Sequence, residues 1–283
     1  MNEYVKTFLE QRTKPIVAKG DFTKDGILFC GTCGEPKQAW IDWLPDADGN
    51  VEKKLVPVMC QCAVEREKKE KDDMERDRFR ESLRHFNLSI RGNEAFSAST
   101  FQNDDSPDSS ISRACRKYVE QWKEMREDNI GILFYGSKGT GKTYYAECIV
   151  NAMIEKGIVA VMTTTANLMN VLSGFDRTET MDAIYRVPLL ALDDLGAERD
   201  TSYSAELMYS VIDTRCKAGK PTIVTTNLDL EEMKHEEDLW RARIYDRVIE
   251  MCPIAIPMVG KSRRSANADI RKQKAREILG GKT

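Results

Sequence analysis

The stretch "NIGILFYGSKGTGKTYYAEC", residues 129–148, decides the fold. An apolar run of the kind found in buried strands leads into a glycine-rich loop, and a helix-forming run follows. The loop itself, "GSKGTGKT", fits the spacing G-x-x-x-x-G-K-[ST] from Gly136 to Thr143. Glycines let backbone N–H groups curl around an anion, and the next helix points its positive end at the anion. The stretch therefore predicts a phosphate-binding loop between a strand and a helix.

Each residue type in this loop has a chemical reason. A lysine at position 142 can reach the β- and γ-phosphates of a nucleotide, and the hydroxyl of Thr143 can ligate Mg²⁺. A chance match in a flexible glycine loop is the alternative, but the flanking strand and helix argue against it. We expect the nucleotide ATP to contact the following residues: Gly136, Ser137, Lys138, Gly139, Thr140, Gly141, Lys142, Thr143 and Tyr144.

Strand and helix patterns alternate after the loop. A helix is expected over residues 142–157, and further strands over 158–165, 187–196 and 220–228. Strands that alternate with helices predict an α/β fold in which a parallel sheet lies between helices. No internal repeat is found.

Two acids and an amide follow the later strands. Asp193 and Asp194 end the apolar run "LLALDDLG", where a P-loop protein needs an acid for its metal. We assign Asp193 to Mg²⁺ and Asp194 to polarising the attacking water. Asn227, which ends "TIVTTN", is expected to orient that water. An acidic helix cap and an ordinary turn residue are the alternatives for these positions.

Composition divides the chain into three regions. Residues 1–64 hold four cysteines and a turn-rich stretch, "LPDADGN". The run from Glu65 to Phe86 is almost wholly charged with mixed signs, which predicts an exposed helix in a charged helical linker over residues 65–100. This helix leads into a polar stretch, "NEAFSASTFQNDDSPDSS", residues 93–110, which is expected to be a linker. Residues 101–283 form the expected nucleotide-binding domain.

The cysteines of the first region are spaced as metal ligands. Cys30-x-x-Cys33 is followed by Cys60-x-Cys62 after a strand-rich insert. Four thiolates suit tetrahedral zinc, and so short a module lacks the core to fold without help. The C-x-C spacing of the second pair departs from the commonest pattern, and free buried cysteines are the alternative. The other cysteines are scattered and are expected to pack as small apolar residues: Cys115, Cys148, Cys216 and Cys252.

Bulk properties exclude several classes of protein. No apolar run approaches the roughly 18 residues of a membrane span, and the N-terminus lacks the pattern of a signal peptide. We therefore expect a cytoplasmic protein, in which eight cysteines argue against a disulfide framework. The net charge of −3 excludes a simple basic nucleic-acid binder, although residues 261–283 carry eight Lys or Arg. The histidines, His85 and His235, lie near no second candidate ligand and are expected to be structural or exposed.

The motifs "GSKGTGKT", "LLALDDLGAE" and "TIVTTNL", in this order, resemble the AAA+ ATPases of the DnaC/DnaI helicase-loader family. The resemblance covers roughly residues 95–265, and IstB-like transposition helpers share the same core. It implies ATP hydrolysis with Mg²⁺, a DnaB-type hexameric helicase and single-stranded DNA as partners, and a homo-oligomer on the DNA or on the helicase. Loaders of the DnaI type also carry a cysteine-rich N-terminal domain, which supports the zinc prediction by analogy.

The resemblance also assigns arginines. "RIYDRV" is similar to the arginine-finger segment, which makes Arg247 the first choice and Arg243 the second. "GKSRRS" is similar to the sensor-2 segment, where Arg264 would touch the nucleotide, although the adjacent Arg263 could serve instead. Surface salt bridges are the alternative for all four arginines.

A segment between the second and third strands is the candidate contact for DNA. In loaders a helical insertion here lies along the DNA, and hydroxyl, amide and guanidinium groups suit phosphate contacts. An ordinary crossover helix is the alternative. The candidates are Thr163, Thr164, Asn167, Arg177 and Arg186.

Four functions remain open from the sequence. The first is ATP-dependent loading of a replicative helicase during initiation of DNA replication. The second is an IstB-like ATPase helper of transposition, which the cysteine set disfavours. A metabolic P-loop kinase would need an acceptor pocket and lid, which the sequence does not suggest. A non-catalytic ATP switch would differ from the first function in its turnover.

Overall fold

The computed structural model describes residues 15–42, 51, 53–85, 94–174, 177–197, 201–260, 262 and 272–278, with side chains left out at 82–85 and 94–95. The chain forms two compact units, Met1–Arg78 and Phe79–Thr283. Sensor-2 candidates Arg263 and Arg264 lie outside the described residues. Within the described helices, none combines the length and the apolar character that crossing a membrane requires.

In the N-terminal unit, the described residues form two small hairpins and the first part of a long helix. The first hairpin pairs Phe22 with Phe29, whose rings stack with centroids 5.6 Å apart. The second hairpin pairs Gln38 with Pro57, within the region expected to be rich in strands. The elements are β1 (Phe22–Lys24), β2 (Ile27–Phe29), β3 (Gln38–Asp42), β4 (Lys53–Pro57) and α2 (Gln61–His85).

Helix α2 is the charged helix expected from the sequence. It begins directly after Cys60, and its side chain–side chain contacts include a hydrogen bond from Gln61 to Glu65, 2.9 Å. Its Arg76 pairs with Asp73 at the helical i,i+3 spacing. Such exposed pairs stabilise a helix by only about 0.2–0.5 kcal/mol each. Most of the side chains described in α2, from residue 61 to residue 81, are exposed to solvent.

A five-stranded parallel sheet forms the centre of the second unit, in the order β6-β7-β8-β5-β9. This confirms the predicted α/β fold and its four strands. The fifth strand was not predicted, because prolines at both ends of "PIAIP" resemble a loop. The strands are β5 (Ile132–Tyr135), β6 (Ala160–Thr164), β7 (Leu189–Leu195), β8 (Thr222–Thr226) and β9 (Ile254–Pro257).

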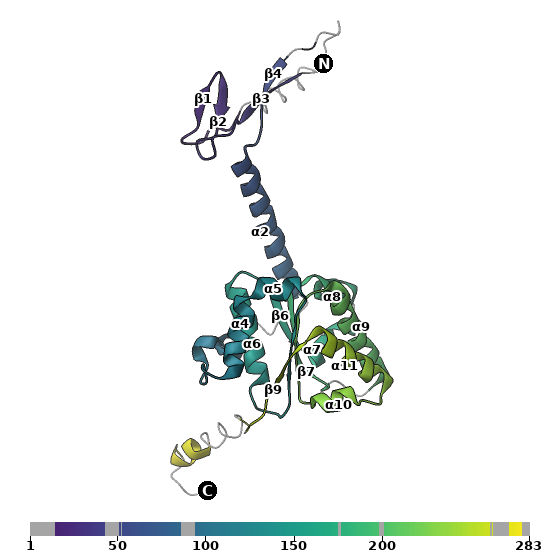
Figure 1. The fold of residues 1–283 in the computed structure, drawn as a ribbon. Helices are drawn as coiled ribbons and strands as arrows, with labels where there is room; N and C mark the ends of the chain where they lie inside the picture. Colours follow the sequence, from purple (N-terminus) through teal and green to yellow (C-terminus); the bar gives the residue numbers. More distant parts are fainter. Residues whose placement is uncertain are drawn as a thin grey trace. The chain divides into compact units, whose positions relative to one another are not determined.

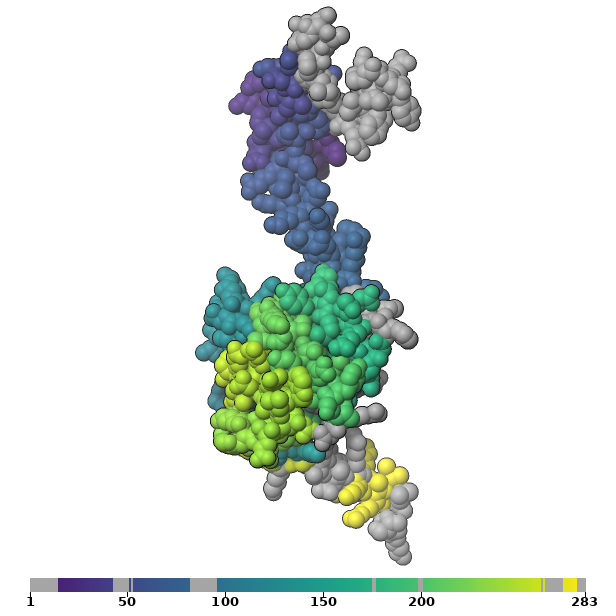
Figure 2. Space-filling model, turned by 90° about the vertical axis from the view of Figure 1, so that its right-hand side faces the viewer, coloured from purple at the N-terminus to yellow at the C-terminus, as the bar shows by residue number. Residues whose placement is uncertain are grey.

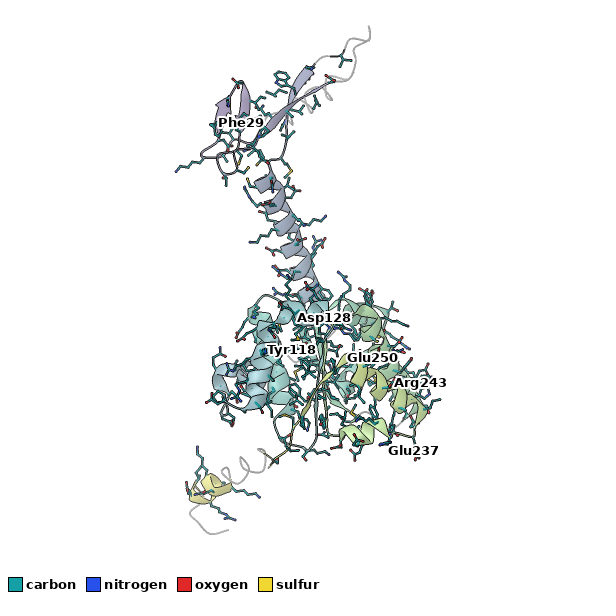
Figure 3. All side chains as sticks on the ribbon, viewed as in Figure 1. Phe29, Tyr118, Asp128, Glu237, Arg243 and Glu250 are labelled. Carbon is teal, nitrogen blue, oxygen red and sulfur yellow. The ribbon has the colours of Figure 1, made fainter. Side chains whose placement is uncertain are left out.

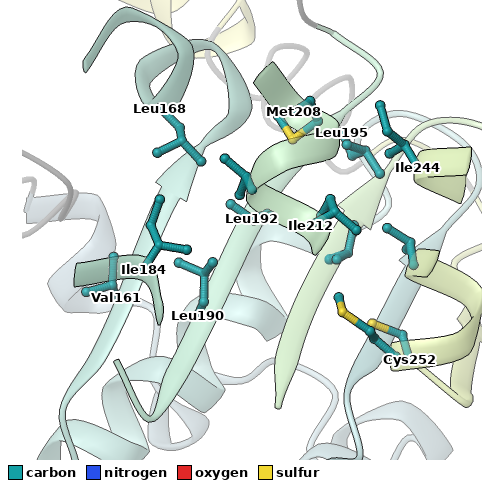
Figure 4. Close-up of a cluster of buried hydrophobic side chains, with 14 of the residues drawn as sticks. Val161, Leu168, Ile184, Leu190, Leu192, Leu195, Met208, Ile212, Ile244 and Cys252 are labelled. Carbon is teal, nitrogen blue, oxygen red and sulfur yellow. The ribbon is translucent and has the colours of Figure 1, made fainter. Parts of the chain in front are cut away.

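Helices cover both faces of this sheet (Figure 1). One apolar cluster joins the sheet to α4 and α6, and includes Phe134, Ile149 and Met153. The other joins the sheet to α7, α8, α9 and α11, with side chains such as Leu190, Ile212 and Ile244 meeting between the layers (Figure 4). The helices are α3 (Glu94–Ala98), η1 (Phe101–Asn103), α4 (Ser110–Glu120), α5 (Trp122–Glu127), α6 (Lys142–Glu155), α7 (Thr165–Leu172), α8 (Arg177–Arg186), α9 (Ser202–Ala218), α10 (Leu230–Lys234) and α11 (Leu239–Met251).

The stretch expected to be a polar linker proves to be partly core. Phe96 and Phe101 are buried in the cluster that contains α6. The amide of Asn151 on α6 donates to the carbonyls of Phe96 at 2.7 Å and Ser99 at 2.9 Å. Residues 96–101 therefore pack against the core and do not form the polar linker expected here, because two isolated aromatic residues among polar ones show no periodicity in sequence.

Candidate nucleotide-binding site and cysteine cluster

The phosphate-binding loop follows β5 and runs into the first turn of α6, which begins at Lys142. Gly136 has a φ of 111°, and a Cβ there would lie 3.0 Å from the carbonyl oxygen of Met258. Gly139 has a φ of 80°, and a Cβ there would lie 2.2 Å from the hydroxyl oxygen of Ser262. Both positions need glycine for backbone conformation and for space. The loop is thus packed against the segment that follows β9.

Lys142 is folded onto the loop that precedes it. Its side chain is buried, and its ammonium donates to the carbonyl oxygens of Gly136 at 2.8 Å and Ser137 at 2.7 Å. A buried cation at the start of α6 adds to the positive end of that helix. The loop therefore presents backbone N–H groups and a lysine charge in the same small space.

Asp193 lies opposite the loop, at the carboxyl end of β7. One of its oxygens accepts a hydrogen bond from the hydroxyl of Thr143 at 2.9 Å and a second from the hydroxyl of Thr225 at 2.6 Å. Carboxylate and hydroxyl oxygens are ligands that Mg²⁺ takes in P-loop proteins. The 2.9 Å contact joins the two residues predicted to serve the metal.

Asp194 is held in an unusual backbone conformation. The pairing of β7 with β8 is irregular between Leu192 and Leu195, and Asp194 has a φ of 62°. Its amide donates to the hydroxyl of Thr225 at 2.9 Å, and its carbonyl accepts from the hydroxyl of Thr165 at 3.0 Å. Left-handed conformations of non-glycine residues cost free energy and concentrate at functional sites. Asp193 and Asp194 lie at this irregularity, and their carboxylates reach different partners: Thr143 and Thr225 for Asp193, and Asn227 for Asp194.

The amide of Asn227 donates to Asp194 Oδ1 at 2.6 Å. Asn227 follows β8, the neighbour of β7 in the sheet, so the two residues meet because their strands are adjacent. The structure thus joins the acid and the amide that the sequence analysis assigned to the attacking water.

A cleft of about 1040 Å³ lies above these residues. Predicted residues that line it include Lys138, Gly139, Gly141, Lys142, Thr143, Tyr144, Asp193, Asp194 and Asn227. The volume exceeds the roughly 300–1,000 Å³ of small-ligand pockets, which leaves room for a nucleoside triphosphate. Predicted loop residues Gly136, Ser137 and Thr140 are absent from this lining.

Several residues that line the cleft were missed by sequence reasoning. Asp105, Glu147 and Thr225 are the clearest cases. Glu147 accepts a hydrogen bond from the Ser99 hydroxyl at 2.6 Å, and burial raises the pKa of its carboxyl group. Its position four residues after Thr143, one helical turn along the same face, was the available signal. Asp105 follows the short 3-10 helix η1, and no comparable spacing in the sequence marks it as a residue of the cleft.

The two candidate finger arginines lie on α11 and do not line the cleft. Arg247 forms an ion pair with Glu250, with Nη1 and Oε2 2.9 Å apart. Arg243 lies over the ring of Trp240, 5.4 Å from its centroid. Figure 3 shows Arg243 and Glu250 on the outer layer of helices. In the space-filling view of Figure 2, the green to yellow-green segments, which include α9 and α11, form much of the visible surface of the second unit.

The predicted DNA-contacting residues are not all accessible. The side chain of Thr163 is fully buried and accepts a hydrogen bond from the Asn167 amide at 3.0 Å, so its predicted DNA contact is wrong for this conformation. Thr164 caps α7 by accepting from the amide N–H of Asn167 at 3.1 Å. Arg186 pairs with Asp182 at 3.6 Å. Arg177 is exposed at the first position of α8.

The four predicted metal ligands converge in the N-terminal unit. The sulfur atoms of Cys30, Cys33, Cys60 and Cys62 all lie within 4.8 Å of one another. The sulfur of Cys62 is 3.5 Å from that of Cys30 and 3.4 Å from that of Cys60. Neighbouring sulfurs of a tetrahedral zinc site lie about 3.8 Å apart, since each Zn–S bond is about 2.3 Å, whereas a disulfide is about 2.05 Å long. The arrangement fits zinc and excludes disulfides among these residues.

Backbone groups favour a negative charge on one of these sulfurs. N–H groups of Cys33 and Thr32 point at the sulfur of Cys30 and lower its pKa to about 6. Zinc requires thiolates, so this tight turn prepares a ligand for the metal. Cys115, Cys148 and Cys252 are buried in the second unit, as predicted, whereas Cys216 is partly exposed.

Comparison with known proteins relates the chain to ATP-binding replication proteins. The sequence pattern of the IstB-like ATP binding protein family matches residues 61–270. The replicative helicase loader DnaC of Escherichia coli K12 is 29% identical over 140 residues, which are 47% of this chain and 54% of DnaC. The replicative helicase loader DnaI of Bacillus subtilis 168 is 29% identical over 181 residues, 58% of each chain. The match thus spans little more than half of either relative.

A crystal structure of DnaI has a similar fold. It superposes with a TM-score of 0.52 at 24% identity and covers 64% of this chain and 99% of that chain. At this identity the likeness concerns the fold. Together with the two loaders, it confirms the resemblance seen in the sequence motifs.

Proposed function

Because this chain belongs to the family of IstB-like ATP-binding proteins, we propose that it is an ATPase that loads a replicative DnaB-type helicase onto single-stranded DNA during initiation of DNA replication. The contact between Thr143 and Asp193, 2.9 Å, carries the nucleotide part of this proposal, because it joins the P-loop to the acid of a second motif. The similarity to DnaC and DnaI supports the helicase part. A cytoplasmic location is part of the same proposal.

The phosphates would lie in the loop from Gly136 to Thr143. Lys142, now bonded to two loop carbonyls, would turn its ammonium to the β- and γ-phosphates. Thr143 and Asp193 would hold Mg²⁺, which when bound neutralises charge on the phosphate oxygens. Tyr144, whose hydroxyl donates to the carbonyl of Thr100 at 2.9 Å, would stand beside the nucleoside.

Hydrolysis needs a water molecule aligned with the γ-phosphate. Asp194 would accept a proton from that water, and Asn227 keeps the carboxylate in place through the 2.6 Å hydrogen bond. The hydrogen bonds of the Asp194 main chain to the hydroxyls of Thr225 and Thr165 fix the backbone from which this carboxylate projects. Positioning of this kind is the main contribution of a protein to phosphoryl transfer.

Arg247 would complete the site of a neighbouring subunit. Arg247 does not line its own cleft, which suits a residue that acts in trans in a homo-oligomer. Exchange of Glu250 for a phosphate would retain a charged partner. Arg243 is the second candidate. Arg264, with Arg263 as the alternative, would contact the nucleotide of its own chain.

The cysteine module would bind zinc and, with α2, contact the helicase. Its four sulfurs suit one zinc ion per chain. Exposed apolar side chains on its second hairpin, such as Trp40 and Ile41, fit a contact with another protein. Single-stranded DNA would then lie on the ATPase core.

Helping transposition is the alternative function, since the family shares its ATP-binding core. The similarity to the replicative helicase loaders DnaC and DnaI favours the first function. A non-catalytic ATP switch would bind ATP without turnover.

A reconstituted loading assay tests the proposal. The full chain is mixed with a DnaB-type hexamer and circular single-stranded DNA, with ATP, ADP or no nucleotide, and the helicase recovered on the circle is measured. Loading that requires this chain and ATP is expected. Absence of loading together with ATP-dependent binding to duplex DNA would favour the transposition helper, and tight ATP binding without turnover would favour the switch.

A further inference from the structure

An ion pair that the proposed function does not use lies beside the cysteine cluster. The ammonium of Lys37 is 2.6 Å from Asp21 Oδ2, and the two side chains are only 15% and 2% exposed. The same ammonium donates to the carbonyl oxygen of Ile16 at 2.5 Å. A covered ion pair costs desolvation energy, so it persists only where further hydrogen bonds satisfy both partners.

Asp21 fastens the loop that carries the first two sulfurs. Its Oδ1 accepts from the amide N–H of Gly31 at 3.0 Å, and its Oδ2 accepts from that of Ala18 at 2.7 Å. Gly31 lies between Cys30 and Cys33, and a Cβ there would lie 2.0 Å from the carbonyl oxygen of Gly20. The backbone from Ala18 to Asp21 is therefore pressed against the cysteine loop, with Asp21 as the bridge.

Lys37 lies beside both cysteine pairs: its N–H donates to the carbonyl of Leu28 at 2.7 Å, two residues before Cys30, and its carbonyl accepts from the N–H of Val58 at 2.8 Å, two residues before Cys60. Its pKa is raised, chiefly by the hydrogen bond to Asp21 and further by the charges of Cys30 and Cys60. Four thiolates around one Zn²⁺ leave a net charge of −2, which is costly in a partly dry environment. A neighbouring ammonium offsets part of that charge, and a carboxylate that holds the ammonium fixes its position.

We propose that Asp21 and Lys37 are positioning residues for the zinc centre: Asp21 orients the Cys30–Cys33 loop, and Lys37 offsets the charge of the thiolates. The inference rests on the proposed zinc site and adds the residues that set its affinity. It also implies that zinc binding and the folding of Ile16–Asp21 are coupled, because the two share the same hydrogen bonds.

Zinc competition in the full-length protein tests this pair. Lys37→Met and Asp21→Asn are compared with the parent, with Lys37→Arg, which keeps the charge, and with Lys24→Met, which removes an exposed lysine of the same unit. Zinc is competed with a colorimetric chelator. We expect Lys37→Met and Asp21→Asn to weaken zinc binding about 10- to 100-fold, as outer ligand contacts do elsewhere. Lys37→Arg should recover much of the loss, and Lys24→Met should match the parent.

Cobalt substitution separates an electrostatic role from a structural one. At full Co²⁺ occupancy, loss of the nearby charge in Lys37→Met should shift the sulfur-to-cobalt charge-transfer band to longer wavelength, and Lys37→Arg should leave it near the parental position. If the parent holds no zinc, the zinc proposal fails and this inference with it. If the parent holds zinc while Lys37→Met and Asp21→Asn match Lys24→Met in affinity and spectrum, this inference alone is overturned.

Discussion

Asn227 holds the carboxylate of Asp194 from the next strand of the sheet, at a distance of 2.6 Å. The two residues are 33 positions apart in sequence and meet because β7 and β8 are neighbours. Asp194 also has a left-handed backbone conformation, with a φ of 62°. The position of its carboxylate therefore depends on this backbone conformation and on the hydrogen bond from Asn227.

Asp194→Asn should slow ATP hydrolysis while leaving ATP binding nearly unchanged. The substitution keeps the shape of the side chain but removes the base, and a positioned general base contributes about 100-fold or more to a rate. Steady-state phosphate release and fluorescent-nucleotide titration measure the two effects. Asp182→Asn on exposed α8 is the matched control, and hydrolysis at the parental rate in Asp194→Asn would remove this role.

Lys142→Ala should weaken ATP binding itself. The variant loses the buried ammonium that donates to two loop carbonyls, so the affinity for ATP should fall about tenfold or more, as expected for a lost charged hydrogen bond. Isothermal titration calorimetry measures the affinity. Lys123→Ala, at an exposed position of α5, serves as the control, and an equal affinity in Lys142→Ala and the parent would contradict the assignment.

Thr225→Val should disturb both acids at once. The hydroxyl donates to Asp193 and accepts from the amide of Asp194, so valine leaves a buried N–H without a partner. The unfolding free energy should fall by about 1–3 kcal/mol. Chemical denaturation measures this loss, and Mg²⁺-dependent ATP affinity should also fall. The control Thr178→Val, on the exposed side of α8, should change neither the unfolding free energy nor the ATP affinity. If Thr225→Val has the parental stability and the parental ATP affinity, the Thr225 hydroxyl does not have this role.

Removal of zinc should unfold the N-terminal module and spare the ATPase core. Metal analysis should find one zinc per chain, and the double variant Cys60→Ser, Cys62→Ser should lose it. The core has its own apolar clusters, so ATP binding should persist after chelation. Cys216→Ser, in the core, is the control. Unchanged zinc content in the double variant would eliminate the four-cysteine site.

Single-stranded DNA should bind more tightly with ATP than without it. Phosphate contacts release counterions, so affinity should fall steeply with salt and depend little on base sequence. Arg177→Ala, at the exposed start of α8, should weaken binding, whereas Lys123→Ala on α5 should not. Fluorescence anisotropy with a labelled oligonucleotide measures both. A preference for duplex at every salt concentration would favour the transposition helper.

The sequence by itself determined the features that are written in contiguous residues. The P-loop has its glycines, lysine and threonine within eight positions of the sequence. The apolar runs of β5 to β8 also predict buried strands. The spacing of Cys30, Cys33, Cys60 and Cys62 likewise predicted a cluster that the structure brings within 4.8 Å. Such signals are local, because backbone conformation and short-range ligand geometry depend on near neighbours in the chain.

Only the tertiary structure decided which distant residues meet. The order of strands β7 and β8 joins Asp194 to Asn227 and inserts Thr225 between the two acids. Packing on α6 makes Phe96 and Phe101 core residues, and packing beneath α7 buries Thr163. A side chain that is polar in sequence becomes a ligand, a structural bridge or a solvent contact according to what is folded against it, and that information is not present in local sequence patterns.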